Sequence, residues 1–202
     1  MAELKIDKYV FLGDAVGYMP HGAEVLELLN SINADCLMGN HEAMLCGFLD
    51  YSNERDKVYQ LKKALPKIPE HTLKNIKTWL PFKVLTFDNI NVLFAHGSPW
   101  NPLLGYVHPD STERSYNNSQ YDFIFLGHSH RPFISKNTRT TVVNVGSVGL
   151  PRDFGNMPSF VIWDTITGEV EIIRIEIDNR ELILDLEKNN THEEVLMCMN
   201  RA

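Results

Sequence analysis

Two short apolar segments joined by an amphipathic stretch constrain the fold of this chain most. Residues 8–12 and 34–38 are apolar runs of strand length, and residues 23–32 carry apolar side chains at helical spacing. A strand, a helix and a second strand within about 30 residues form a βαβ unit, whose two strands are parallel. We therefore expect Asp14 and Asn40, which follow the two strands, to share the carboxyl edge of a sheet, where α/β folds bind ligands.

The rest of the chain alternates strand and helix signals and contains no linker, repeat or low-complexity tract. Strands are predicted at residues 82–87, 91–95, 121–126, 141–145, 159–164 and 170–177, the first two and the last two as hairpins. Terminal helices are predicted at residues 180–187 and 192–200. Residues 43–80 are expected to be helical cover for a sheet, with Thr72 as the N-cap of a helix over residues 73–80. The sequence predicts one α/β domain spanning residues 1–202.

The composition argues against several kinds of protein. The 202 residues carry a net charge of −7, so we expect no extended nucleic-acid surface of the kind that neutralises phosphates. The N-terminus lacks the apolar core of a signal peptide, and no apolar run approaches the ~20 residues that span a bilayer. The three widely spaced cysteines are expected to be reduced thiols of a cytoplasmic protein; they are Cys36, Cys46 and Cys198.

Polar side chains follow four of the predicted strands. In chain order they are Asp14, Asn40 with His41, His96, and His128 with His130. In Gly127-His128-Ser129-His130, imidazoles at positions i and i+2 can reach one crevice, although the same four residues are equally compatible with two ordinary loop histidines. A carboxylate, an amide oxygen and several imidazoles suit Mn²⁺, Fe, Ni²⁺ or Zn²⁺ better than Ca²⁺. The sequence therefore predicts a transition-metal site at one sheet edge.

These residues carry a resemblance to a known family. Gly13-Asp14, Gly39-Asn40-His41-Glu42, His96-Gly97 and Gly127-His128-Ser129-His130, in that order, resemble the motifs of the calcineurin-like metallophosphoesterases. The segments 13–18 and 144–152 resemble the small bacterial and archaeal phosphodiesterase branch of that family. The resemblance covers residues 8–177 of the chain, and the four ordered motifs make it specific.

The resemblance implies a four-layer α/β/β/α sandwich with two divalent transition metals. By analogy, Asp14 would bridge both metals, Asn40, His96 and His128 would complete one site, and His130 would serve the other. His41 would lie beside the scissile phosphate as a general acid or charge stabiliser, because an imidazole can donate a proton to a leaving alkoxide near neutral pH.

The sequence departs from the family at its start. The family begins with a strand that ends in Asp-x-His, and none of the eight histidines of this chain follows an aspartate by two positions. We therefore expect the first strand of the sandwich to be missing from a shortened version of a longer protein, one metal site to be complete, and the second to have only Asp14 and His130. A strand edge left unpaired in this way would favour homo-oligomer formation.

The leading hypothesis is a phosphoesterase that acts on phosphodiesters or small phosphate esters. Arg152 and Asn40 are candidate substrate-binding residues, with an ion pair between Arg152 and Asp153 as the alternative for the arginine. Tyr106 is expected to pack within its loop, and loops 17–22, 43–58 and 99–119 are expected to shape the pocket. The alternatives are an impaired enzyme or pseudo-enzyme that binds one metal and phosphate, and a metallo-β-lactamase-type hydrolase, which the Arg131-Pro132 pair after His130 disfavours.

Overall fold

A computed structural model describes residues 5–87, 89–111, 116 and 119–201. The first βαβ unit is confirmed: β1 (Val10–Phe11) and β2 (Asp35–Cys36) are paired in parallel, and α1 (Gly22–Ser31) connects them. The apolar face of α1 packs into a core cluster with Phe11 and Cys36, so the helix covers one face of this strand pair. Because the strands are parallel, both of the segments that follow them emerge at the same edge.

A five-stranded mixed sheet forms the largest part of the molecule. Its strands are β3 (Phe82–Phe87), β4 (Ile90–Ala95), β5 (Phe123–Leu126), β6 (Phe133–Lys136) and β7 (Thr141–Asn144), in the order β3-β4-β5-β7-β6. The β3–β4 hairpin is confirmed, and β4, β5 and β7 are parallel to one another. Strand β6 was not predicted, because a four-residue strand directly after Arg131-Pro132 has little apolar pattern of its own; it forms only by pairing with β7.

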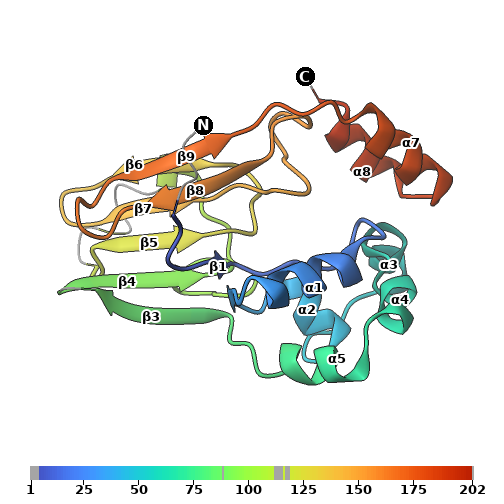
Figure 1. Ribbon diagram of the computed structural model, residues 1–202, viewed down its shortest axis with the longest axis horizontal. Coiled ribbons are helices and arrows are strands. Elements are labelled where there is room, and N and C mark those ends of the chain that lie inside the picture. Colours follow the sequence, from blue (N-terminus) through green and yellow to red (C-terminus); the bar gives the residue numbers. More distant parts are fainter. Residues whose placement is uncertain (1–4, 88, 112–115, 117–118, 202) are drawn as a thin grey trace.

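The two parts of the sheet framework pack face to face. A buried cluster joins Leu12 and Leu37, beside β1 and β2, to Phe94, Phe125 and Val143 of the large sheet. The predicted hairpin of β8 (Ser159–Trp163) and β9 (Val170–Arg174) is confirmed and contributes to the same cluster. Figure 1 shows the strands gathered on one side of the molecule and the helices on the other. The expected α/β sandwich is thereby confirmed, and on the outer face of the large sheet Val107 and Tyr116 come from the long loop.

Four short helices follow β2. They are α2 (Asn40–Leu45), α3 (Asn53–Tyr59), α4 (Leu61–Ala64) and α5 (Glu70–Ile76), with a 3-10 turn, η1 (Leu65–Lys67), before α5. The predicted N-cap at Thr72 is wrong, because α5 begins at Glu70 with Pro69 as its N-cap. The proline fixes the start of the helix, since its ring sets an extended entry and leaves no backbone N–H to satisfy.

Two helices close the chain, as predicted: α7 (Arg180–Lys188) and α8 (Glu193–Met199). Leu186 and Val195 from this pair are fully buried in a cluster with Val58 of α3 and Leu150. The pair therefore packs above α3 and the segment before α1, at the carboxyl edge of the strands (Figure 1). Among the described residues, no helix has both the length and the apolar character needed to cross a bilayer.

One ion-pair network ties β1 and β2 to β3. The Asp35 carboxylate lies 2.5 Å from Lys8 Nζ and 2.9 Å from Lys83 Nζ. Its bonds to Lys8 and Lys83 lower the pKa of Asp35 below its ordinary value of 3.8. We expect Asp35→Asn to lower the free energy of unfolding by about 0.5–1 kcal/mol near neutral pH, because partly exposed ion pairs contribute little.

The effect should depend on pH in one direction. Because the folded-state pKa is lowered, the contribution of Asp35 is present above the unfolded value and is lost as the pH falls through the folded value. Urea unfolding of the wild type and the variant at decreasing pH should show the difference shrinking. Asp50→Asn, at an exposed carboxylate, is the control and should change stability by less than about 0.5 kcal/mol. A pH-independent difference would contradict the assignment.

Candidate metal centre and substrate cavity

The segments after β1, β2, β4 and β5 bring four potential ligands together. Nε2 of His96 lies 3.0 Å from Asn40 Oδ1, 3.1 Å from His128 Nδ1 and 3.4 Å from Asp14 Oδ2. Asp14, His96 and His128 form a group whose ligand atoms all lie within 4.8 Å of one another. The structure thus gathers four of the five predicted metal ligands around one point.

The protonation of His96 makes this point suitable for a cation. Its Nδ1 lies 2.6 Å from the carbonyl oxygen of Leu12, which can only accept a hydrogen bond, so Nδ1 carries the proton. In the neutral tautomer, Nε2 then carries a lone pair. The lone pairs of Asn40 Oδ1 and Asp14 Oδ2 face this lone pair and repel it. A cation between these atoms would remove the repulsion, which is the physical reason the donor set fits a metal.

His128 offers a second sign of a ligand site. Burial and the neighbouring His96 lower the pKa of His128 to about 3, so its imidazole is neutral at physiological pH, the form that binds metals. Its Nδ1 is the ring nitrogen that faces His96 Nε2, at 3.1 Å. The ring of Tyr106 packs against it, with ring centroids 4.2 Å apart.

His130 lies in the same cavity but outside this group. Its Nδ1 lies 2.7 Å from the carbonyl oxygen of Leu150, which fixes the proton on Nδ1 and frees Nε2. Burial and Arg152 lower the pKa of His130 to about 4. The structure therefore divides the two histidines of the Gly127–His130 segment, as the resemblance implies, and the role of His130 as a ligand of a second metal stays a prediction.

Backbone geometry at these ligands is strained. Asp14, His128 and His130 have φ values of 64°, 58° and 59°, in the left-handed region that non-glycine residues rarely adopt. Each such residue costs of order 1–3 kcal/mol and persists only when the surroundings impose it. Only glycine fits at position 13, where φ is 94°, because the Cβ of any other residue would lie 2.5 Å from the backbone nitrogen of Gly39. The strand ends are held in conformations that direct these side chains to one point.

Glu42 organises the ligand loops, a role that sequence reasoning missed. Its buried carboxylate accepts backbone N–H bonds from Asp14 at 2.8 Å, Ala15 at 2.7 Å, Val16 at 3.3 Å and Gly39 at 2.9 Å. Burial and the nearby Asp14 raise the pKa of Glu42, while the N–H donors oppose the rise. Glu42 is part of the Gly39-Asn40-His41-Glu42 motif, but its role as a hydrogen-bond acceptor for the segments after β1 and β2 follows only from the structure.

Asp14 is oriented from the other side by α2. Its Oδ1 accepts the backbone N–H of His41 at 3.0 Å, in the first turn of that helix. Burial would raise the pKa of Asp14, but His96, His41 and this hydrogen bond lower it, so the carboxylate is ionised. An ionised carboxylate beside imidazoles is a donor set that suits divalent transition metals.

The sequence and the fold have well-defined relatives. The family model of the calcineurin-like phosphoesterase superfamily domain matches residues 1–168. The chain belongs to this superfamily. It is 31% identical over 211 residues to an uncharacterized protein of Methanocaldococcus jannaschii, covering 93% of this chain and 84% of that protein.

Two solved structures share the fold of this phosphoesterase-family chain. A hypothetical protein from Pyrococcus horikoshii has a TM-score of 0.83 at 21% identity and covers 98% of this chain and 87% of its own. A metallophosphoesterase from Sphaerobacter thermophilus has a TM-score of 0.80 at 19% identity, and the match covers 96% of this chain and 88% of that protein. At these identities the likeness concerns the fold.

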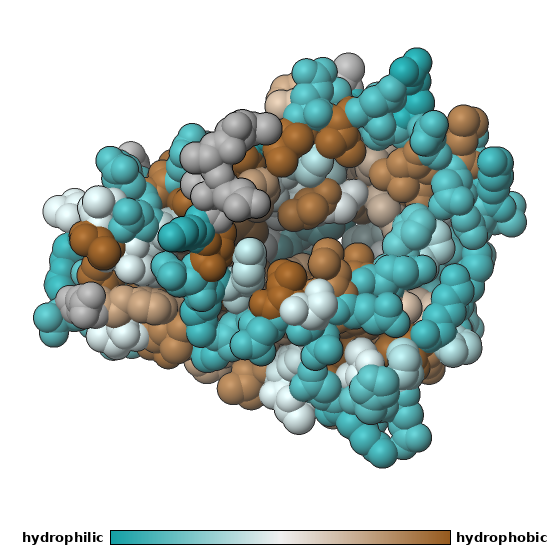
Figure 2. Space-filling view, in the orientation of Figure 1, coloured by the Kyte–Doolittle hydropathy of each residue, from teal (hydrophilic) through white to brown (hydrophobic). Residues whose placement is uncertain are grey.

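A cavity of about 530 Å³ opens beside the ligand group of this phosphoesterase-family chain. In Figure 2 the surface is hollowed beneath α7 and α8, between the sheet side and the helix side of the molecule. Asp14, Asn40, His128 and His130 line it from the sheet edge. Its size is ordinary for a small-molecule site.

The wall of the cavity agrees with one expectation and adds to it. The segments 17–22, 43–58 and 99–119 line it through Tyr18, Arg55, Val58 and Tyr106, so residues 43–58 do more than cover the sheet. Helix α8 lines it as well, and no sequence motif marked that helix. Tyr106 packs against a ligand histidine rather than only within its loop.

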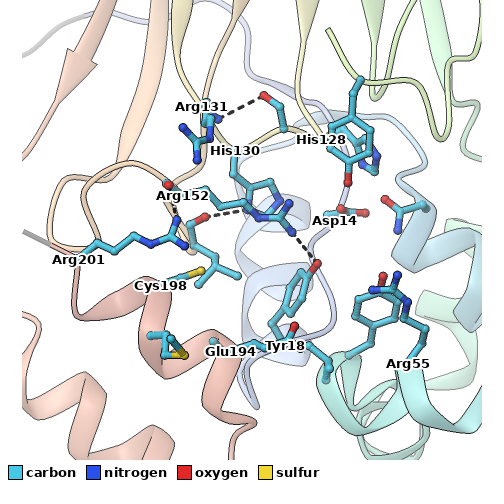
Figure 3. A pocket seen from close by; sticks show the side chains of 18 of the residues that line it. Asp14, Tyr18, Arg55, His128, His130, Arg131, Arg152, Glu194, Cys198 and Arg201 are labelled. Carbon is cyan, nitrogen blue, oxygen red and sulfur yellow. Dashed lines mark hydrogen bonds between the residues drawn. The ribbon is translucent and has the colours of Figure 1, made fainter. Parts of the chain in front are cut away.

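Arg152 points into this cavity (Figure 3). It donates a hydrogen bond to the Tyr18 hydroxyl at 3.0 Å. Burial would lower the pKa of Arg152, but the hydroxyls of Tyr18 and Tyr106 raise it, so the guanidinium is charged. The alternative ion pair with Asp153 is wrong, because that carboxylate pairs with Arg174.

His41 lies next to the cavity and behind an aromatic ring. The imidazole is fully buried, with ring centroids 4.6 Å from Tyr18 and 4.5 Å from Tyr59. Burial lowers its pKa, and its Nδ1 has no hydrogen-bond partner within the described part of the chain. It is not among the described residues that line the cavity, so its predicted contact with the scissile phosphate stays a prediction.

Proposed function

We propose that this chain is a metal-dependent phosphoesterase that hydrolyses phosphodiesters or other small phosphate esters. The observation that carries the proposal is the convergence of three lone-pair donors on His96 Nε2, beside a cavity that also holds a charged arginine. Membership of the calcineurin-like phosphoesterase superfamily supports the same reaction class. The metal that we propose is Mn²⁺ or another divalent transition metal, and the compartment is the cytoplasm, in keeping with three free cysteines.

The residues of the site would divide the work as follows. Asp14, Asn40, His96 and His128 would hold a cation, which when bound polarises phosphoryl oxygens and lowers the pKa of water. Arg152 would bind phosphate oxygens through its planar fork, with the hydroxyls of Tyr18 and Tyr106 fixing its position. Asn40 uses its carbonyl oxygen toward His96, which leaves its amide N–H groups for the substrate. His41 would reach a leaving group only after Tyr18 moves aside.

A second candidate is a chain that binds one metal and phosphate without efficient turnover. Two observations favour it. Among the described residues, only Asp14 and His130 are available for a second cation next to the first, and two ligands hold a metal weakly. The proposed proton donor His41 is also covered by Tyr18.

Hydrolysis and metal content together separate the two candidates. The purified protein, supplied with Mn²⁺, should hydrolyse bis(p-nitrophenyl) phosphate. Chelation with EDTA should abolish the reaction, because the negative charge on the phosphoryl oxygens loses its cation. Metal analysis should find about one tightly bound metal per chain, since one ligand group is complete. Stoichiometric metal without hydrolysis of this or of a monoester would support the binding protein instead, and hydrolysis that resists EDTA would refute both.

A further inference from the structure

Three arginines meet on the His130 side of the cavity, although they come from distant parts of the sequence. Arg131 follows His130 directly, and the backbone N–H of Arg152 donates to the carbonyl oxygen of His130 at 3.2 Å. The guanidinium of Arg201 donates to the carbonyl oxygen of Arg152 at 2.6 Å. All three line the cavity, and Figure 3 shows Arg131 and Arg201 on the side of Arg152 that faces away from Asp14.

The charges of these arginines are not compensated by the protein. No ion pair between any of the three and a carboxylate is found among the described residues. The guanidinium groups of Arg152 and Arg201 donate to neutral oxygens, the Tyr18 hydroxyl and the Arg152 carbonyl. The carboxylates that line the cavity are Asp14, at the ligand group, and Glu194 of α8, which forms no ion pair within 4 Å. Among the described residues, four arginines and no lysine line this cavity, although the net charge of the chain is −7.

Like charges gathered in a cleft repel one another unless an anion joins them. A cleft with low-dielectric walls concentrates the field of its charges, so the cluster attracts anions more strongly than dispersed surface arginines would. Guanidinium groups bind phosphate oxygens in pairs of parallel hydrogen bonds, which suits a phosphate better than a monovalent anion.

We propose that Arg131, Arg152 and Arg201 form an anion subsite that binds a second phosphate group of the substrate, next to the one held at the metal centre. This proposal rests on the proposed function in one respect, that the first phosphate of the substrate binds at the metal centre. Arg152 lies between the two positions. Its guanidinium donates to the Tyr18 hydroxyl near the ligand group, and its backbone carbonyl accepts a hydrogen bond from Arg201. The substrate is then a small organic molecule with two phosphate groups.

Apolar side chains in the same cavity suit the organic part of such a molecule. Val58 of α3 and Val195 and Met197 of α8 line the cavity with apolar side chains. Arg201 and α8 lie beyond residue 168, where the match to the superfamily domain ends. The second phosphate is therefore recognised partly by a segment that the shared domain does not include, which would restrict substrates without changing the reaction.

Two nucleotides that differ by one phosphate test the subsite. We expect metal-loaded protein to bind adenosine 3′,5′-bisphosphate at least about tenfold more tightly than adenosine 5′-monophosphate in calorimetry, because charge-assisted bonds to a second phosphate are worth that factor. The preference should fall as salt is added, since the subsite is partly exposed. Equal affinities, or a preference that salt does not change, would overturn the proposal.

Variants assign the preference to these side chains. Arg131→Gln with Arg201→Gln should reduce the preference to less than about threefold, in proportion to the bonds removed. Arg139→Gln with Arg180→Gln is the matched control, because it removes two positive charges from exposed arginines that do not line the cavity. A preference that survives the double substitution, or that the control loses equally, would contradict the subsite.

Two further outcomes keep the inference separate from the proposed function. Selective binding of the bisphosphate without hydrolysis of any ester would support the subsite and remove the proposed function. Hydrolysis without a preference for the bisphosphate would support the proposed function and contradict the subsite. Inorganic phosphate is a third arm: if it strengthens monophosphate binding in a chain that shows no bisphosphate preference, the cluster binds free phosphate, and the proposal about the substrate is wrong.

Discussion

His96→Ala is expected to lower the hydrolysis of bis(p-nitrophenyl) phosphate by about a thousandfold or more and to remove the bound metal. His96 is the residue on which the other three donors converge, so its loss opens the ligand group at its centre. A cation that contributes several kcal/mol to the transition state accounts for a factor of this size. Steady-state kinetics and metal analysis of the same preparations provide the measurement.

The control for this variant is a histidine outside the site. His71 is exposed in α5, and His71→Ala should keep metal content and rate within a factor of about two. Because His96 is buried and bonds to the Leu12 carbonyl, its removal also costs about 1–3 kcal/mol of stability, so the assays require a temperature well below the unfolding transition. Activity that survives in a folded His96→Ala protein would contradict this metal centre.

Glu42→Ala is expected to have the largest effect on stability, about 3–5 kcal/mol. The substitution leaves backbone N–H groups that now donate to the carboxylate buried without an acceptor, among them those of Asp14 and Gly39. Each unsatisfied buried donor costs about 1–3 kcal/mol. Asp14 should lose its orientation as well, so metal affinity should fall by at least about tenfold, the factor typical for residues that orient ligands. Thermal unfolding and metal titration are the measurements.

Two substitutions bracket that result. Glu42→Gln keeps one acceptor oxygen and should be less destabilising than Glu42→Ala. Glu27→Ala, at an exposed position of α1, removes the same carboxylate and should change stability by less than about 0.5 kcal/mol. If Glu42→Ala were as stable as the wild type, the four N–H bonds could not be what holds the strained segment after β1.

The strands and their ends were predictable because their signals are local. An apolar run that stops at a glycine and a polar residue marks a strand end without reference to the rest of the chain, which is why Asp14, His96 and His128 could be named as ligands. Parallel pairing of β1 and β2 followed from the intervening helix. Strand β6 was missed because its pairing with β7 supplies the stabilisation that its own four residues lack.

The surroundings of the site were not predictable because they depend on contacts between distant segments. The packing of α8 over the cavity brings residue 201 against residue 152, and nothing in the helical periodicity of residues 193–199 indicates that partner. The same holds for Tyr106 on His128 and for His41 between two tyrosines. Side chains of this kind acquire a role only from what they touch.

By itself, the sequence predicted the candidate ligand types and their order along the chain, and with them the superfamily. The tertiary structure decided which ligands share a point: His128 joins His96 and Asp14, and His130 stands apart. The physical reason lies in the backbone. Asp14, His128 and His130 adopt left-handed conformations that cost energy in isolation and persist only because the surrounding structure imposes them. At Asp14, a hydrogen bond to the Glu42 carboxylate is one of those restraints.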